Sequence, residues 1–251
     1  MSASRQPLRL QPLKSTDDRA AIPLFTVSDA ARFLKLPSET MRNWVRGYDW
    51  PGSRGKEHTE PIVTSVPPEK HGYPNIPFVG ITEALVLTAF KRQGIRMHKI
   101  KQVLLALERE VGVHNALANK SLFTAGADIL WDFAKSAQDH DLRDEIKQLV
   151  EPSRGQTVFV PAVRQYLQHI TYDDDLWALS LRLPAFEPLN VVIDMRRNFG
   201  RPILDKSRVR VEDIANRFYA GDTIDSIAAD FELDRDEVES IVRVFPVRRA
   251  A

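Results

Sequence analysis

The hydrophobic pattern of residues 25–48 predicts two short helices joined by a tight turn. Thr26 can cap the first helix, and Asp29, three residues later, completes a capping box. Pro37 ends this helix, because proline disfavours the helical conformation in the residue before it. The first helix has a narrow apolar face of mostly small residues, Ala30, Ala31 and Leu34. The pattern therefore predicts a helix-turn-helix hairpin.

The second helix is expected from about Ser38 to Arg46. Its inward side is apolar at helical spacing, with Met41, Trp44 and Val45. Its outward side carries arginine, asparagine and threonine, which suit the major groove of DNA. An ordinary helical hairpin with a solvated face is the alternative. The DNA-contacting residues predicted on this helix are Ser38, Glu39, Thr40, Arg42, Asn43 and Arg46.

Residues 49–78, rich in proline, glycine and charge, follow directly. Two short strand-like pieces, 61–64 and 75–79, flank the turn-rich segment 67–72. Two strands around such a tip, after a helix-turn-helix, predict a β-wing. The residues expected on its approaches or tip, where phosphate or minor-groove contacts are made, are Arg54, Lys56, Lys70 and His71.

Two further helices are predicted at 83–93, capped by Thr82, and at 95–111, where apolar residues form one stripe. Six basic residues and two acidic ones lie between Glu83 and Arg109. Such an excess suits a surface that contacts the nucleic-acid backbone. The basic residues clustered at the junction of the two helices are Lys91, Arg92, Arg96, Lys99 and Lys101.

A two-helix head, a wing and a helix pair, in this order, resemble the MerR-like winged helix-turn-helix. The stretches FTVSDAARFLKLPSETMRNWV and KRQGIRMHKIKQVLLAL carry the resemblance, which covers residues 24–112. It implies a DNA-binding domain over residues 23–112. MerR regulators continue into a long coiled-coil helix and an effector domain. Here the apolar stripe stops at Gly112, and the chain contains no cysteine to sense a metal or thiol.

The whole chain is expected to be mainly α with minor β. Residues 1–22 are polar and basic and predict a flexible arm. Residues 113–190 predict a small mixed α/β region, with strands at 129–133 and 177–183 and a helix at 158–170. Residues 191–251 predict two short strands around a glycine turn and then a trihelical domain, with helices at 211–220, 224–231 and 236–245.

The trihelical domain also has a helix-turn-helix shape, but its charge opposes DNA binding. Residues 221–241 contain eight acidic residues and one basic residue, Arg235. Such a face repels phosphate. We therefore expect this domain to contact protein, either a partner or a second copy. The basic string before it, residues 196–210, could pair with an acidic surface on that partner.

The C-terminal stretch NFGRPILDKSRVRVEDIANRFYAGDTIDSIAADFELDRDEVESIVRVF resembles the small domain of unknown function in one group of VapB-type antitoxins. Together with the MerR-like head, the resemblance spans nearly all of residues 24–245. Residues 205–207 depart from it, where the family more often has a glycine-containing turn. No single motif is specific; the ordered combination is.

This resemblance implies an antitoxin of a type II, VapBC-like system. Such a protein binds and neutralises a PIN-type ribonuclease toxin encoded by the adjacent gene, and represses its own operon by binding double-stranded promoter DNA. A homodimer or a higher toxin–antitoxin assembly is expected. Toxins of this class use a carboxylate cluster, so arginines are the partner-binding candidates: Arg208, Arg210, Arg243, Arg248 and Arg249.

A MerR-like regulator that responds to a small ligand, without a toxin partner, is the alternative function. Trp131, Phe133 and Trp177 could line its pocket, although aromatic residues are more often core residues.

An enzyme is the third hypothesis, with Asp173, Asp174, Asp175 or Asp194 as metal-binding carboxylates of a nuclease. Consecutive aspartates point in different directions, and the six histidines show no paired ligand spacing. A phosphate-binding glycine loop and a nucleophile elbow are also absent. We therefore predict no catalytic residue, no metal site and no cofactor. Without a secretory signal, a membrane span or cysteine, a cytoplasmic protein is expected.

Overall fold

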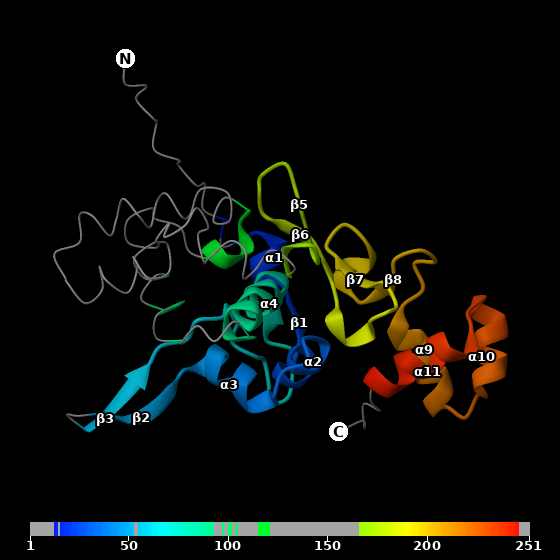
Figure 1. Ribbon diagram of the computed structural model, residues 1–251, viewed down its shortest axis with the longest axis horizontal. Helices are drawn as coiled ribbons and strands as arrows, with labels where there is room; N and C mark the ends of the chain where they lie inside the picture. Colours follow the sequence, from blue (N-terminus) through cyan, green and yellow to red (C-terminus); the bar gives the residue numbers. More distant parts are fainter. Residues whose placement is uncertain are drawn as a thin grey trace, which may run out of the picture.

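The computed structural model is elongated and has three parts (Figure 1). The N-terminal head carries a protruding β-hairpin at one end, a small antiparallel sheet lies in the middle, and three helices form the other end. The mainly α fold with minor β agrees with the expected class. The structure describes residues 13–14, 16–52, 55–92, 97, 100–101, 104, 115–120 and 166–245.

The head begins with helix α1 and contains the helix-turn-helix pair. The bounds are α1 Asp18–Ala21, β1 Pro23–Phe25, α2 Val27–Phe33 and α3 Ser38–Arg46. Helix α1 shows that the arm expected over residues 1–22 is structured at its C-terminal end. Arg19 of this helix pairs with Asp17 and, at 2.5 Å, with Asp175 near the middle sheet. Residues 1–12 lie outside the described part.

Helices α2 and α3 form as the sequence predicts. The capping box is present: the Asp29 amide donates to Thr26 Oγ1 at 3.1 Å, and the Thr26 amide donates back to the Asp29 carboxylate. The apolar faces of both helices turn inward, so the pair is anchored on the core through residues at helical spacing. The buried residues of this pair are Ala30, Ala31, Phe33, Leu34, Met41, Trp44 and Val45.

Helix α4, Phe78–Arg92, is the centre of the head (Figure 1). It starts earlier than predicted, and Thr82 is an interior residue rather than a cap. The Thr82 hydroxyl donates to the Phe78 carbonyl at 2.9 Å. Residues 78–90 are all buried, because the sequence FVGITEALVLTAF is apolar on nearly every side. A search for one apolar stripe misplaces the start of such a helix.

The strands of the head differ from the predicted wing. Segment 61–64 is a loop whose Ile62 and Val63 amides donate to the Trp44 carbonyl at 2.9 and 3.1 Å. Segment 75–79 contributes only β4, Ile76–Pro77, which pairs antiparallel with β1. The hairpin that follows α3 is instead β2, Tyr48–Gly52, with β3, Gly55–Thr59. Its sequence, YDWPGSRGKEHT, has no alternation of apolar and polar residues that would predict strands.

Glu83 is a buried carboxyl group in the middle of α4. Its Oε2 accepts the Thr64 amide at 2.7 Å, and its Oε1 accepts the Asn115 side-chain amide at 3.2 Å. Burial raises the pKa of Glu83 from its ordinary value of 4.5 to about 7, and these hydrogen bonds oppose the rise. The residue therefore ties the 61–64 loop, and through it the end of α3, to the helix at the centre of the head.

The middle sheet has the order β5-β6-β7-β8, and all its pairs are antiparallel. Its strands are β5 Ile170–Tyr172, β6 Ala178–Arg182, β7 Val191–Asp194 and β8 Ile203–Leu204. The sheet is continuous across residues 190 and 191, where we expected two regions to meet. Strand β6 confirms the strand predicted at 177–183, whereas 129–133 and most of 158–170 lie outside the described residues. Short 3-10 turns are η1 Ala116–Ala118, η2 Pro184–Phe186 and η3 Asn198–Gly200.

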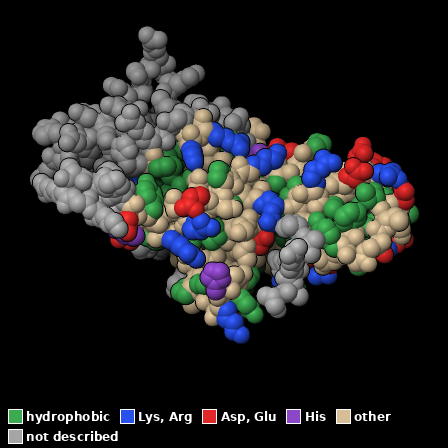
Figure 2. All heavy atoms as spheres, turned by 90° about the horizontal axis from the view of Figure 1, so that it is seen from below, with side chains coloured by type: hydrophobic (Ala, Val, Ile, Leu, Met, Phe, Trp, Pro, Cys, Tyr) green, Lys and Arg blue, Asp and Glu red, His purple; other side chains and the backbone are tan. Residues whose placement is uncertain are grey.

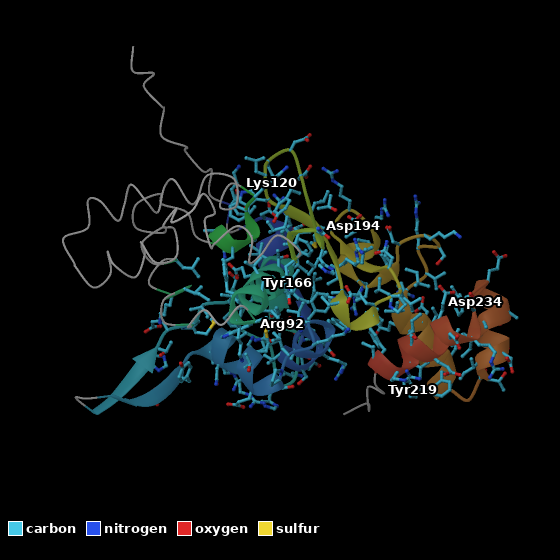
Figure 3. All side chains as sticks on the ribbon, viewed as in Figure 1. Arg92, Lys120, Tyr166, Asp194, Tyr219 and Asp234 are labelled. Atoms are coloured by element: carbon cyan, nitrogen blue, oxygen red, sulfur yellow. The ribbon has the colours of Figure 1, made fainter. Side chains whose placement is uncertain are left out.

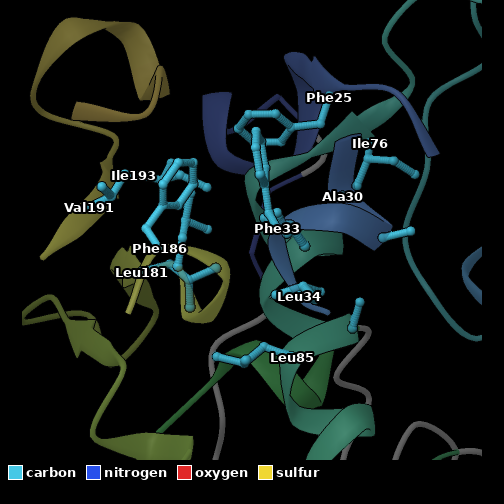
Figure 4. Packing of buried hydrophobic residues seen from close by; sticks show 14 of the residues in the cluster. Phe25, Ala30, Phe33, Leu34, Ile76, Leu85, Leu181, Phe186, Val191 and Ile193 are labelled. Atoms are coloured by element: carbon cyan, nitrogen blue, oxygen red, sulfur yellow. The ribbon is translucent and has the colours of Figure 1, made fainter. Parts of the chain in front are cut away.

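The three C-terminal helices are α9 Val211–Tyr219, α10 Ile224–Phe231 and α11 Arg235–Val244, close to the predicted bounds. An aromatic cluster joins them to the head. The Phe33 ring at the end of α2 lies 5.8 Å from the rings of Phe186 and of Phe245, and 5.7 Å from that of Phe25. Figure 4 shows Phe33 between Phe25 and Phe186. The head, the sheet and the helical end therefore share one hydrophobic core.

The buried Glu83 predicts a dependence of stability on pH. Between pH 4.5 and about 7 the folded state binds a proton that the unfolded state has released, so the free energy of unfolding falls as pH rises through this window. The raised pKa corresponds to about 3 kcal/mol. Glu83→Gln should remove this slope in urea titrations at pH 4.5 to 8. The exposed Glu39→Gln is the control and should retain it; equal slopes in wild type and Glu83→Gln would refute the assignment.

Candidate nucleic-acid interface

Helix α3 presents a polar face on the side opposite its core contacts. Ser38, Glu39, Arg42 and Arg46 are exposed, and Thr40 and Asn43 are half-buried. Because Met41, Trp44 and Val45 hold the other side against the core, this face is presented without movement of the helix. Figure 2, which views the molecule from below, shows lysine and arginine side chains spread over the middle of this side.

Arg42 on α3 has an exposed ion-pair partner that it can exchange for another. Arg42 forms an ion pair with Glu39, one turn earlier on the same exposed face. Exposed pairs of this kind contribute little to stability, at most about 1 kcal/mol. Moving Arg42 from Glu39 to a base edge or phosphate therefore costs little.

Lys91, at the end of α4, adds a cation beside this face. Its Nζ donates to Thr40 Oγ1 at 3.2 Å. Arg92 instead contacts Tyr166: its Nη1 donates to the Tyr166 hydroxyl at 2.7 Å, and its guanidinium lies over the Tyr166 ring. Figure 3 labels both residues in the head. Lys101 donates to the Glu60 carbonyl, and burial lowers its pKa. Arg96 and Lys99 lie outside the described residues.

The hairpin β2–β3 leaves the end of α3 directly, through Gly47. In the strand register Tyr48 lies opposite Thr59, and Asp49 lies opposite His58. The side chains of Asp49 and His58 are hydrogen-bonded, with 2.8 Å between Oδ1 and Nδ1. The hairpin extends away from the rest of the head in Figure 1. A projecting hairpin next to the second helix of a helix-turn-helix is placed where minor-groove or phosphate contacts can be made.

The four basic residues expected on the wing are separated in the structure. Lys56 lies on β3, opposite Pro51, and Arg54 lies outside the described residues. Lys70 and His71 are exposed on a different turn, closed by the Tyr73 amide donating to the Lys70 carbonyl at 3.1 Å. The prediction that all four belong to one wing is wrong, because segment 61–64 is a loop and β4, which follows Lys70 and His71, pairs with β1 instead.

The arginines considered for partner binding lie in varied surroundings. Arg208 is exposed, Arg210 pairs with Asp213 at 2.8 Å, and Arg243 lies 3.7 Å from Glu239. Arg248 and Arg249 lie outside the described residues. Most arginines of the basic string, residues 196–210, form ion pairs with carboxylates of the same chain. The sequence did not predict these pairs, because several of the carboxylates are distant along the chain. These further pairs are Arg196–Asp173, Arg197–Asp194, Arg197–Asp205 and Arg201–Glu212.

Three of the four aspartates considered for a nuclease site, Asp173, Asp175 and Asp194, pair with arginines. Asp173 accepts Arg196 through both oxygens at 2.6 and 2.7 Å, and Asp175 accepts Arg19. Within the described residues, no group of three or more carboxylate, histidine or cysteine side chains is placed to hold a metal ion.

Trp177, considered as part of a ligand pocket, is a buried core residue. It clusters with Val79 of α4 and with Ala116 and Ala118 of η1. The other two residues of that prediction, Trp131 and Phe133, lie outside the described part of the chain.

The charged side chains of the C-terminal helices are mainly acidic, with eight acidic residues and one basic residue over residues 221–241. Figure 2 shows acidic side chains at this end of the molecule, among basic and hydrophobic ones. Arg217 pairs with Asp222 and Asp230, each at 2.6 Å. This end therefore repels phosphate, in contrast to the face of α3. Among the described helices, none is long and apolar enough to cross a membrane.

An exposed polar α3 beside a projecting hairpin defines a helix-turn-helix protein of the DNA-binding class. Residues 23–104 match a family described as a putative DNA-binding HTH domain, and residues 191–243 match a protein family of unknown function, DUF433. The chain is 39% identical over 222 residues to the putative antitoxin VapB45 of Mycobacterium tuberculosis, covering 88% of this chain and 92% of that protein.

The crystal structure of Rv2018 from Mycobacterium tuberculosis is similar as well, with 36% identity and a TM-score of 0.68. The match covers 89% of this chain and 99% of that one. The protein described here belongs to the family of VapB45-type antitoxins.

Gly47 sets the path from α3 into the hairpin and supplies a test of that geometry. Its φ is +71°, and a Cβ atom would lie 1.9 Å from the Thr59 carbonyl oxygen. Gly47→Ala should lower stability by more than the roughly 1–3 kcal/mol of left-handed strain, and should weaken DNA binding by displacing the hairpin. Gly72→Ala, with φ +86° and open space around its Cβ, carries the strain alone. Equal melting temperatures for the two variants would contradict this account.

Proposed function

We propose that this protein is the antitoxin of a type II, VapBC-like toxin–antitoxin system. It represses its own operon by binding double-stranded promoter DNA, and neutralises a PIN-type ribonuclease toxin, encoded by the adjacent gene, through direct contact. Its place of action is the cytoplasm. The family membership supports the antitoxin role, and the match over residues 23–104 supports the DNA-binding role.

The single observation that carries the DNA-binding role is the two-sided character of α3. Its apolar side is fully used in the core, and its polar side offers Arg42, Asn43 and Arg46 to solvent. Arginine pairs well with guanine, and asparagine with adenine, in the major groove. Lys91 and the hairpin stand beside this face, where phosphate contacts fix the register of a reading helix.

A homodimer fits this role. Two copies of the head would read half-sites about one helical turn apart, so the promoter site should be a pseudo-palindrome. The acidic helices α9–α11 would remain away from the DNA and be available to other contacts, because their charge disfavours phosphate.

Promoter binding tests the DNA-binding role. Wild-type protein should prefer its own promoter fragment over random duplex at every salt concentration, and its affinity should fall as salt rises. Arg42→Ala combined with Asn43→Ala should abolish this preference, because each good base contact contributes about 1–3 kcal/mol of discrimination. Arg243→Ala, an exposed arginine on α11, is the matched control.

Two results would count against this role. Wild-type affinity that is equal for promoter and random duplex would show that the protein is not the repressor of its operon. A preserved preference in the Arg42 and Asn43 double variant would remove these residues from the reading face.

Co-expression with the product of the adjacent gene tests the antitoxin role. The two proteins should elute as one complex in size-exclusion chromatography, and the complex should lack the ribonuclease activity of the free toxin. A protein that elutes alone beside an active toxin would contradict the antitoxin role and leave the DNA-binding role standing.

A further inference from the structure

Phe199 is the most exposed large apolar side chain in the described part of the chain. It is 89% exposed, and the next, Tyr73, is 50% exposed. Phe199 lies in η3, in the loop between β7 and β8, within the stretch that matches the family of unknown function. Fully solvated aromatic rings gain nothing for folding, since burial is what makes an aromatic side chain stabilising.

The backbone that carries Phe199 is held in an unusual conformation. Asn198, Phe199 and Gly200 have φ values of +49°, +53° and +71°, so three consecutive residues are left-handed. For a bulky residue such as phenylalanine this conformation is strained, and it persists only when the surroundings enforce it. Strain of this kind is concentrated at functional sites and ligand clamps.

The surroundings of this turn do enforce it. A Cβ atom on Gly200 would lie 2.8 Å from Leu24 Cδ1 of strand β1 and 3.0 Å from Met195 Sδ, so the turn is seated tightly against the head. The Gly200 amide donates to the Arg197 carbonyl at 3.2 Å, and the Arg201 amide donates to that of Asn198 at 3.0 Å. The phenyl ring is therefore displayed on a fixed support rather than on a loose loop.

A second strained turn stands beside the first. Asp173, at the start of the β5–β6 turn, accepts hydrogen bonds from Arg196 Nη2 through both of its carboxylate oxygens. Arg196 lies two residues before η3, which carries Phe199. The β5–β6 turn holds Leu176, a further exposed apolar residue with a left-handed φ of +66°. The antiparallel register places both turns at the same end of the sheet.

Most charged side chains around Phe199 are paired within the chain, and Lys206 and Arg208 are the two cations of this stretch that form no ion pair within the described residues. Residues 191–210 contain six arginine or lysine residues and two aspartates. Arg196, Arg197 and Arg201 keep exposed side chains although they have ion-pair partners. Lys206 and Arg208 are exposed as well. A partner that covers this surface is therefore favoured when it presents carboxylates to Lys206 and Arg208 at the rim of the pocket that receives the ring.

We propose that Phe199 is the apolar anchor by which the toxin is held, inserting into a pocket whose rim carries carboxylates. The proposal rests on the antitoxin role above and names its contact surface. Aromatic residues in a rigid frame are typical of the few side chains that dominate an interface. A self-contact of this surface is disfavoured, because a two-fold interface sets the same patch against itself and would bring the exposed cations Lys206 and Arg208 of the two copies together.

The position of the anchor has a consequence for regulation. In Figure 1 the loop after β7 lies on the upper side of the molecule and α3 on the lower side. Toxin bound at Phe199 therefore leaves the face of α3 open, and one protein can hold promoter DNA and toxin together.

The test measures binding of the purified product of the adjacent gene to full-length protein by titration calorimetry. Phe199→Ala should weaken the complex at least about tenfold, the range of an interface hot spot, and Phe199→Asp should weaken it further. Arg208→Glu should also weaken it and reduce its salt dependence. Tyr73→Ala, the matched exposed aromatic, should bind like wild type. All variants should keep the wild-type melting curve and promoter affinity.

Four results would overturn the proposal that Phe199 anchors the toxin. Wild-type affinity in Phe199→Ala and Phe199→Asp overturns the anchor while the antitoxin role stands. Failure of the wild type itself to bind overturns the antitoxin role and the anchor with it. Conversion of a dimer to a monomer by Phe199→Ala in light scattering, with toxin binding unchanged, assigns the surface to a second copy and overturns the proposal. Equal losses in Phe199→Ala and Tyr73→Ala also overturn it.

Discussion

The Phe33 ring holds the molecule together at one point. It lies at the end of helix α2 in the head and contacts aromatic rings from strand β1, from η2 between β6 and β7, and from the C-terminal end of α11. Aromatic pairs of this kind contribute about 0.5–1.5 kcal/mol each beyond the area they bury. Because the Phe33 ring contacts aromatic rings from the sheet region and from the helical end, the head that carries α3 and the C-terminal helices share one core.

The position of α3 is likewise fixed by packing and by hydrogen bonds to its last turn. Helix α3 is buried on one side, its last turn receives the Ile62 and Val63 amides on the Trp44 carbonyl, and that loop is fastened to α4 by Glu83. A buried carboxyl group would be costly without its partners; the Thr64 and Asn115 donors make the position tolerable and at the same time define the loop. The exposed polar residues of α3 take no part in the core, so they are available for contacts with a ligand.

Elements with a clear helical period were predictable, and those with mixed or absent patterns were not. Helices α2 and α3 and the C-terminal helices follow from spaced apolar residues, and the start of α2 also follows from its cap, Thr26. The start of α4 was misplaced, because a helix that is apolar all round shows no stripe. The hairpin β2–β3 was missed, because its residues are mostly polar, and its strands were assigned instead to 61–64 and 75–79. Of the candidate site, the outward residues of α3 were identified, whereas the pairing of Arg196 with Asp173 and the exposure of Phe199 depend on contacts and backbone angles that no local pattern contains.

The central claim is that α3 lies in the major groove. Methylation interference on the promoter duplex tests it directly, because dimethyl sulfate marks guanine N7 in the major groove and adenine N3 in the minor groove. Two clusters of interfering guanines, about one helical turn apart, are the predicted result, with adenine interference confined to their flanks, where the hairpins stand. Interference at adenines alone, or at no position, would show that α3 does not enter the major groove and would contradict the account.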